Sequence, residues 1–316
     1  MKIVAVIIAG AIFAITVLFA KFFITNWAPD RPVSELTARW APPPSVFIDV
    51  AGMHVHMRDE GVRDDPNPIV LLHGTAASLH TWEGWVEALK TRRRVIRFDL
   101  PGFGLTGPSP DGNYGIENYV RFVTAMLDKL GVRHCVLVGN SFGGYVAWAT
   151  TLALPDRVDK LILVDAGGYA FAASSPPLGF RIAQLPILNR LFESTLPRSL
   201  VESSVRAVYG DPNKVTSELV DRYYEIALRE GNRKALAQRF AQARPGELAA
   251  RIPELMLPTL ILWGGRDQLI PPEAAARFHR DISGSRLVMF DDLGHVPHEE
   301  DPARTVAAVK AFLGVE

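Results

Sequence analysis

A glycine-rich turn between an apolar strand-like run and an apolar helix-like run constrains this 316-residue chain more than any other feature. The run 136–138 precedes the sequence GNSFGG at 139–144, and the run 145–149 follows it. This spacing matches G-x-S-x-G, in which a sharp strand-to-helix turn pushes the serine side chain into the open. Glycines remove the Cβ atoms that would collide where strand and helix approach closely. The helix N-terminus would favour a negative charge beside Ser141. Ser141 is therefore a candidate nucleophile.

A nucleophilic serine needs a general base, and the base needs an acid that orients it. Asp267 follows the apolar run 258–263 and a Gly-Gly turn, and His295 follows the strand-like run 286–290. The carboxyl ends of parallel strands meet at one edge of an open α/β sheet, where such sheets build their sites. Ser141, Asp267 and His295 are therefore expected to meet there. Asp165, at the end of the apolar run 161–164, is the alternative acid.

Five ordered motifs in residues 45–315 make the chain resemble the α/β-hydrolases. Besides the three residues above, they include HGT at 73–75 and DLPGFG at 99–104, each after an apolar run. The resemblance implies an α/β fold with a mostly parallel sheet. It favours Asp267 over Asp165 as the acid, because the Gly-Gly-Arg-Asp loop matches the family's usual position. It also implies that the backbone N–H groups of Thr75 and Phe142 form the oxyanion hole and that no metal or organic cofactor is needed.

The triad implied by this resemblance would cleave carboxylic esters through an acyl-enzyme, as carboxylesterases and lipases do. One alternative is a carbon–carbon bond hydrolase of ring-cleavage products, which shares the GNSFGG form of the turn. Against it, the loop after His73-Gly74 lacks a glycine-rich run. A cofactor-free haloperoxidase-like enzyme and a non-catalytic binding protein are further alternatives. One fold hosts many chemistries, so the sequence leaves the substrate open.

Other motifs have simpler interpretations. GFGLTG at 102–107 matches G-x-G-x-x-G, but prolines at 108 and 110 leave no helix N-terminus for a pyrophosphate. His54 and His56 alternate along a predicted strand without partners at metal-ligand spacing and are expected at the surface. His298 is expected to point away from the site.

The remaining acidic residues, the single cysteine and the balance of charges indicate no further site. Asp291 and Asp292 are predicted to be solvated turn residues, and the single Cys135 is predicted to be a small buried residue. The chain has 34 basic and 34 acidic residues, so nothing in its charge indicates a nucleic-acid partner.

The N-terminus predicts a membrane anchor. Residues 3–20 carry no charge, and the apolar stretch continues past Lys21 to residue 24. About 22 helical residues span the roughly 30 Å of a bilayer core, so the lipid bilayer is an expected partner through residues 3–24. A cleaved signal peptide is the alternative, although Leu18-Phe19-Ala20 lacks a small-x-small site. An anchor of this kind usually leaves the catalytic domain on the outer, extracytoplasmic side.

The rest of the chain divides by composition. Residues 25–44 end in Ala-Pro-Pro-Pro and predict a spacer that holds the enzyme off the membrane. Residues 45–166 and 253–316 predict the hydrolase core, with helices at 119–130 and 302–313. Residues 167–252 lack strand patterns and predict a helical cap above Ser141. We expect this cap to favour apolar acyl chains through the following side chains, with Arg181 and Arg190 among the few charges: Phe171, Leu178, Phe180, Ile182, Leu185, Ile187, Leu188 and Phe192.

Overall fold

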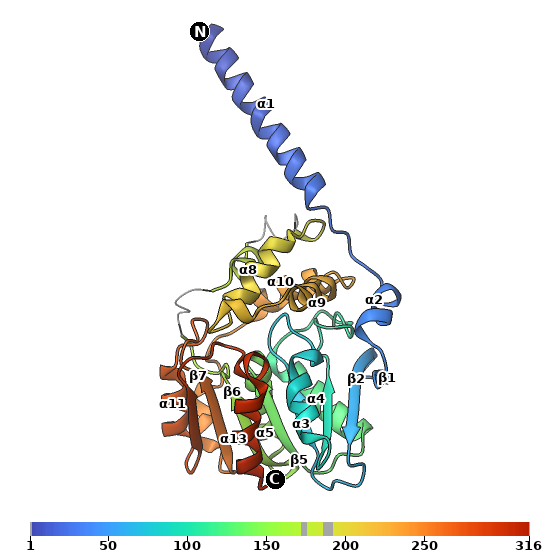
Figure 1. Cartoon of the computed structure of the whole chain (residues 1–316), viewed down its shortest axis with the longest axis vertical. Coiled ribbons are helices and arrows are strands. Elements are labelled where there is room, and N and C mark those ends of the chain that lie inside the picture. The colour runs from blue at the N-terminus through green and yellow to red at the C-terminus, as the bar shows by residue number, and fades with distance from the viewer. Residues whose placement is uncertain (1, 172–175, 186–191, 316) are drawn as a thin grey trace.

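The computed structural model describes residues 2–171, 176–185 and 192–315, and an eight-stranded sheet forms the centre of this described part (Figure 1). The strands lie in the order β1-β2-β4-β3-β5-β6-β7-β8. β2 is antiparallel to β1 and to β4, and the other neighbouring pairs are parallel. The mostly parallel sheet predicted from the sequence is confirmed. The strand bounds are β1 Val46–Val50, β2 Met53–Gly61, β3 Ile69–Leu72, β4 Arg94–Phe98, β5 Cys135–Asn140, β6 Val158–Val164, β7 Thr259–Gly264 and β8 Arg286–Phe290.

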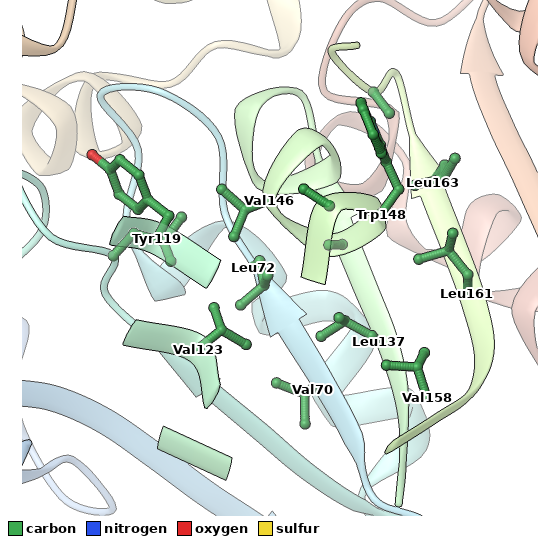
Figure 2. Packing of buried hydrophobic residues seen from close by; sticks show 14 of the residues in the cluster. Val70, Leu72, Tyr119, Val123, Leu137, Val146, Trp148, Val158, Leu161 and Leu163 are labelled. Atoms are coloured by element: carbon green, nitrogen blue, oxygen red, sulfur yellow. The ribbon is translucent and has the colours of Figure 1, made fainter. Parts of the chain in front are cut away.

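Helices cover both faces of this sheet, because successive strand residues point to opposite sides. Val70 and Leu72 of β3 belong to the apolar cluster on one face, to which α4, α5 and α11 contribute side chains. Figure 2 shows part of this cluster, with Tyr119 of α4 and Val146 of α5 over the sheet. Ile69 and Leu71 of β3 pack against α3 and α13 on the other face. Both sides of β3 are therefore buried, which explains its uninterrupted apolar sequence. The helix bounds are α3 Glu83–Leu89, α4 Ile116–Lys129, α5 Phe142–Ala153, α11 Glu273–Asp281, α12 Pro297–Glu300 and α13 Pro302–Leu313.

Between β6 and β7 the described residues form helices and no strand. These helices lie above the sheet in Figure 1, and α8 packs against both α6 and α9. Val205 of α8 and Val220 of α9 share a small apolar cluster with Val296, which lies beside His295. We call residues 167–252 the cap. Its described helices are α6 Leu178–Ala183, α8 Arg198–Arg206, α9 Ser217–Ala227 and α10 Asn232–Gln242, with 3-10 turns at Pro212–Lys214 and Ala249–Glu254.

The N-terminal helix α1, Lys2–Thr25, extends away from the rest of the molecule (Figure 1). Its stretch Ile7–Thr25 is long and apolar enough to cross a membrane, by length and composition. A signal sequence near an N-terminus passes the same test. Ile7, Phe13 and Phe19 are more than half exposed, so these apolar side chains are not covered by the body of the protein.

Residues 26–44 differ from the spacer that the sequence predicts, because most of this range is folded onto the body. Asn26 and Ala28 exchange backbone hydrogen bonds with residues 194–196 of the cap. The helix α2, Val33–Trp40, buries Leu36 and Trp40 against Leu105 and Ile226. The proline-rich composition concealed the i, i+4 pair formed by Leu36 and Trp40, which is the spacing of a buried helix face.

His56 is also not the surface residue that the sequence predicts. It is fully buried, whereas His54 is exposed as expected. Nδ1 of His56 lies 2.7 Å from Oδ2 of Asp99, and its Nε2 lies 2.9 Å from Oγ of Ser45. The His80 ring, in the 3-10 turn Leu79–Trp82, lies over His56. Because β2 is an inner strand, alternation along it cannot separate a solvated face from a covered one.

Candidate active site

Ser141 occupies a strained turn between β5 and α5. Its φ of 55° lies in the left-handed region that residues with a side chain rarely adopt. A Cβ atom on Gly139 would lie 2.1 Å from the Gly143 carbonyl oxygen, and one on Gly143 would lie 2.3 Å from the Leu72 carbonyl oxygen. Only glycine fits at both positions. The strand and helix therefore meet closely enough to project the Ser141 side chain from the turn.

Asp267 and His295 come together at the carboxyl ends of β7 and β8, as predicted. Oδ2 of Asp267 lies 2.7 Å from Nδ1 of His295, and both side chains are buried. Oδ1 of Asp267 accepts hydrogen bonds from the N–H groups of Leu269 and Ile270, at 2.8 and 3.0 Å. A carboxylate held on Nδ1 keeps the proton of the neutral imidazole there and leaves Nε2 free to accept one. His295 lines the same cavity as Ser141.

Asp165 lies beside Asp267. Its Oδ1 accepts a hydrogen bond from the Gly264 N–H at 2.9 Å. Burial, followed by the charge of Asp267, raises the pKa of Asp165 well above its usual range, which favours the neutral form of this carboxyl. Asp165, Asp267 and His295 are the group of described residues whose spacing could suit a metal. Two of the three are already joined, because Oδ2 of Asp267 contacts Nδ1 of His295 as a triad requires.

Two buried polar side chains fix the loop that carries His295. Nδ2 of Asn140 donates hydrogen bonds to the carbonyl oxygens of Val164 and His295, at 3.1 and 3.0 Å. Oε2 of Glu300 accepts from the N–H groups of Gly210 and Gly294, both at 2.8 Å. Asn140 precedes Ser141, so the turn that carries Ser141 is tied directly to the backbone of His295.

The segment His73–Thr75 lies against Ser141. A Cβ atom on Gly74 would be 3.2 Å from the Cβ of Ser141, which shows how close the two backbones are. Nδ1 of His73 donates to the Gly74 carbonyl oxygen at 2.8 Å, and its Nε2 accepts from the Leu100 N–H at 2.9 Å. Burial lowers the pKa of His73, which agrees with this neutral form. Thr75 and Phe142 both line the cavity, where their oxyanion role stays a prediction.

A cavity of about 420 Å³ lies between Ser141 and the cap. Three of the cap side chains predicted from the sequence line it: Phe180, Ile182 and Phe192. Leu178 and Leu185 are instead about half exposed, and Phe171 packs against the core. Arg181 is not among the lining residues. Ile187, Leu188 and Arg190 lie outside the described residues.

The other candidates lie away from this cavity. His298 is buried, with Nε2 3.0 Å from Oγ1 of Thr81 and its ring 4.1 Å from that of Trp82. Asp291 and Asp292 are exposed as predicted. Cys135 is buried, and burial raises the pKa of its thiol to about 12.

The glycine motif at 102–107 does not form an open cradle. A Cβ atom on Gly104 would lie 2.0 Å from the Asp99 carboxyl carbon, so a side chain already fills that side of the turn.

Three residues of the site carried no prediction. Asn140 lies inside the serine motif, directly before Ser141, so its sequence position could have marked it as a residue of the site. Glu300 lies in the short helix after His295, where its acidic side chain resembles an ordinary surface residue in sequence. Arg239 of α10 lines the cavity although it belongs to no motif, and its burial became visible only from the cap packing.

Comparisons with known proteins agree on the fold. The family model described as alpha/beta hydrolase fold matches residues 67–302. The 2-hydroxy-6-oxo-2,4-heptadienoate hydrolase of Pseudomonas putida is 30% identical over 281 residues, covering 85% of this chain and 96% of that protein. The 2-hydroxymuconate semialdehyde hydrolase of a Pseudomonas species is 29% identical and covers 84% of this chain and 92% of that protein.

Solved structures give the same result. The meta-cleavage product hydrolase of Pseudomonas fluorescens is 28% identical with a TM-score of 0.71, covering 85% of this chain and 97% of that one. A structure described as a membrane phospholipase A has a TM-score of 0.74 at 23% identity and covers 99% of this chain and 98% of that one. This second likeness concerns the fold alone, over nearly the whole chain. By its family match and its relatives, the chain belongs to the alpha/beta hydrolase fold family.

Proposed function

We propose that this chain is a serine hydrolase whose Ser141 attacks a substrate carbonyl carbon. The observation that carries the proposal is the 2.7 Å contact between Asp267 and His295 at the cavity that Ser141 lines. As Oγ of Ser141 bonds to the carbonyl carbon, its proton moves to Nε2 of His295. The N–H groups of Thr75 and Phe142 bind the oxyanion, each contributing roughly 3 kcal/mol to transition-state stabilisation.

The intermediate then collapses. The bond to the leaving group breaks, and the leaving group takes the proton from His295, so the acyl group remains on Ser141. Water attacks this acyl-enzyme, gives one proton to His295 and releases a carboxylic acid as Ser141 recovers its proton. One water molecule is consumed, and Asp267 stabilises the imidazolium in both halves.

Carbon–carbon bond cleavage is the first candidate reaction, because several curated relatives at 27–30% identity are named as hydrolases of this type. A solved structure at 27% identity is described instead as a thermophilic esterase, so ester cleavage stays a candidate. In carbon–carbon cleavage the leaving group is a carbon atom. It departs with the bonding electron pair, which a conjugated carbonyl group stabilises, and it takes the proton from His295. The sequence motifs alone favour ester cleavage over this reaction, whereas the names of the curated relatives favour the reverse order.

Ester cleavage is the second candidate, favoured by the apolar lining of the cavity. Phe180, Ile182 and Leu236 present side chains suited to an acyl chain. Each buried methylene contributes about 0.8 kcal/mol, so each added carbon would raise specificity about fourfold. The exposed apolar surface of α1 is consistent with substrates drawn from a lipid phase. On the basis of this exposed apolar surface we also propose that α1 anchors the protein in a membrane, with the catalytic domain on the outer side.

Two measurements test the nucleophile. A fluorophosphonate should label the wild type and not Ser141→Ala, whose turnover should fall by roughly five to six orders of magnitude. Ser203→Ala, at an exposed position of α8, is the matched control and should label normally. Labelling that persists in Ser141→Ala would place the nucleophile elsewhere.

A substrate panel then separates the two reactions. We would compare kcat/KM for 2-hydroxy-6-oxo-2,4-heptadienoate with kcat/KM for p-nitrophenyl acetate, butyrate, hexanoate and octanoate below their micelle thresholds. Preference for the dienoate supports carbon–carbon cleavage. Values that rise from two to six acyl carbons and exceed that for the dienoate support ester cleavage and would reject the first candidate.

A further inference from the structure

Arg239 is a buried cation without an acidic partner. Its side chain lies on α10, and the residue is only 8% exposed. In the described part of the chain no ion pair or hydrogen bond involves its guanidinium, and its Nε atom has no hydrogen-bond partner. The two internal segments outside the description, 172–175 and 186–191, contain no Asp or Glu. This arginine therefore lacks the carboxylate that a buried charge usually requires.

Aromatic rings hold the guanidinium in place. Its central carbon lies 4.5 Å from the ring centroid of Phe142 and 4.6 Å from that of Phe240. The Phe142 ring is packed in turn against Tyr119, 4.8 Å between centroids. Such cation–π contacts stabilise the charge, but ring faces do not replace the oxygen acceptors that guanidinium N–H groups require. Donors therefore remain available at the Arg239 head group.

These donors adjoin the site of chemistry. Arg239 lines the cavity together with Ser141, and the residue whose ring it stacks on, Phe142, is the one that follows the nucleophile. In the described part of the chain, the other Arg and Glu residues that line the cavity each have a polar partner or are exposed to solvent. Arg233 pairs with Asp30 at 2.6 Å, Arg244 is exposed, and Glu247 accepts a hydrogen bond from Tyr145. Arg239 is thus the buried charge whose partner is missing.

We propose that Arg239 binds an anionic oxygen group of the substrate, either a carboxylate or a phosphate. A planar guanidinium with several N–H donors is suited to both, because two of its donors can face two oxygens at once. The substrate would then combine an apolar part, held by the cap, with an anionic group near the reacting carbonyl. This inference rests on the proposed hydrolase function and adds a substrate class to it.

The first test compares a charged ester with a neutral one of the same acyl length. Mono-p-nitrophenyl glutarate and p-nitrophenyl pentanoate both carry five acyl carbons, and only the first carries a carboxylate. The wild type should prefer the glutarate, and Arg239→Met should lower that preference at least tenfold, mainly through KM, as expected for a lost hydrogen bond to a charged group. Arg239→Lys should retain part of it. Arg251→Met removes a charge from the cap surface, outside the cavity lining, and should leave the preference unchanged.

The second test does not depend on turnover, so its failure can be told apart from failure of the hydrolase proposal. In a Ser141→Ala background, glutarate or glycerol 3-phosphate should raise Tm, and Arg239→Met should abolish the rise. The more effective anion assigns the group as carboxylate or phosphate. Circular dichroism checks that each variant is folded. A wild type without preference for the charged ester, or a Tm rise that survives Arg239→Met, would overturn the proposal.

Discussion

Replacement of Asp267 by Asn should be far more damaging than replacement of Asp165 by Asn. Asp267 contacts Nδ1 of His295 at 2.7 Å as a pure acceptor. An amide can turn its NH2 group toward Nδ1, and the imidazole proton then moves to Nε2, facing Ser141. A ring in that tautomer cannot take the serine proton. Amidation of a triad acid elsewhere costs about four orders of magnitude in kcat, or roughly 5.5 kcal/mol, and we expect a similar loss here.

Asp165→Asn should be mild, because a neutral amide keeps the hydrogen bond that Asp165 makes and places no second negative charge beside Asp267. The amide oxygen can accept from the Gly264 N–H, as Oδ1 of Asp165 does at 2.9 Å. A loss of activity within about tenfold is the expected cost of small changes in geometry. Asp165→Ala removes the bond to Gly264, leaves that buried N–H without its acceptor, and serves as the matched variant that should be clearly less stable.

The same variant has a pH signature. Because burial and then Asp267 raise the folded-state pKa of Asp165, the wild type binds a proton that the unfolded chain releases above about pH 4. The full stabilising effect of this proton on the free energy of unfolding is present below that pH. Between the unfolded-state pKa and the raised folded-state pKa of Asp165, the effect falls by about 1.4 kcal/mol per pH unit. Asp165→Asn lacks this decline, so its stability relative to the wild type should improve as pH rises.

Steady-state kinetics on one substrate and denaturant unfolding between pH 5 and 8 measure both effects. Activity lost in Asp165→Asn and kept in Asp267→Asn would refute the assignment of the acid. Stability differences that do not change with pH would refute the protonated state of Asp165.

The N-terminal region supports two further predictions. A chain starting at Ser45 should be less stable than one starting near Asn26, because it loses the buried residues Leu36 and Trp40; Leu36→Ala alone should cost about 2–5 kcal/mol in unfolding experiments. Equal stability of the two truncated chains would show that α2 is dispensable. The full-length protein should need detergent for extraction, and release by carbonate alone would contradict an α1 anchor.

Sequence alone could predict those parts of this protein that depend on local rules. The strand-turn-helix around Ser141 requires glycine at 139 and 143, and that requirement is written in neighbouring residues. The helix α13 coincides with the predicted 302–313 because a proline at its first position and Gly314 after it mark both ends. Asp267 and His295 follow apolar strands, so the sheet edge on which they emerge could be inferred.

What the sequence could not predict depends on contacts between distant segments. Leu36 is buried only because Leu105 and Ile226 lie against α2. His56 is buried because Asp99 of the neighbouring strand's loop and Ser45 satisfy both its ring nitrogens. Arg239 looks like the polar side of a surface helix until the cap folds over the site and encloses it.

The cap is joined to His295, the proposed base, in a way that bears on specificity. The His295 N–H donates to the Val208 carbonyl oxygen of the cap at 2.8 Å. Glu299 pairs with Arg222 and accepts a 2.8 Å hydrogen bond from the Tyr223 hydroxyl, both on α9. Tyr223 also lines the cavity, so one wall of the substrate site is bonded to the loop that holds the base. With the cap fixed there by buried polar contacts, the cavity is largely formed before substrate binds. Selectivity then depends on which side chains the cap presents. Among these, the buried guanidinium of Arg239 lacks an acidic partner, so an anionic ligand would stabilise it most.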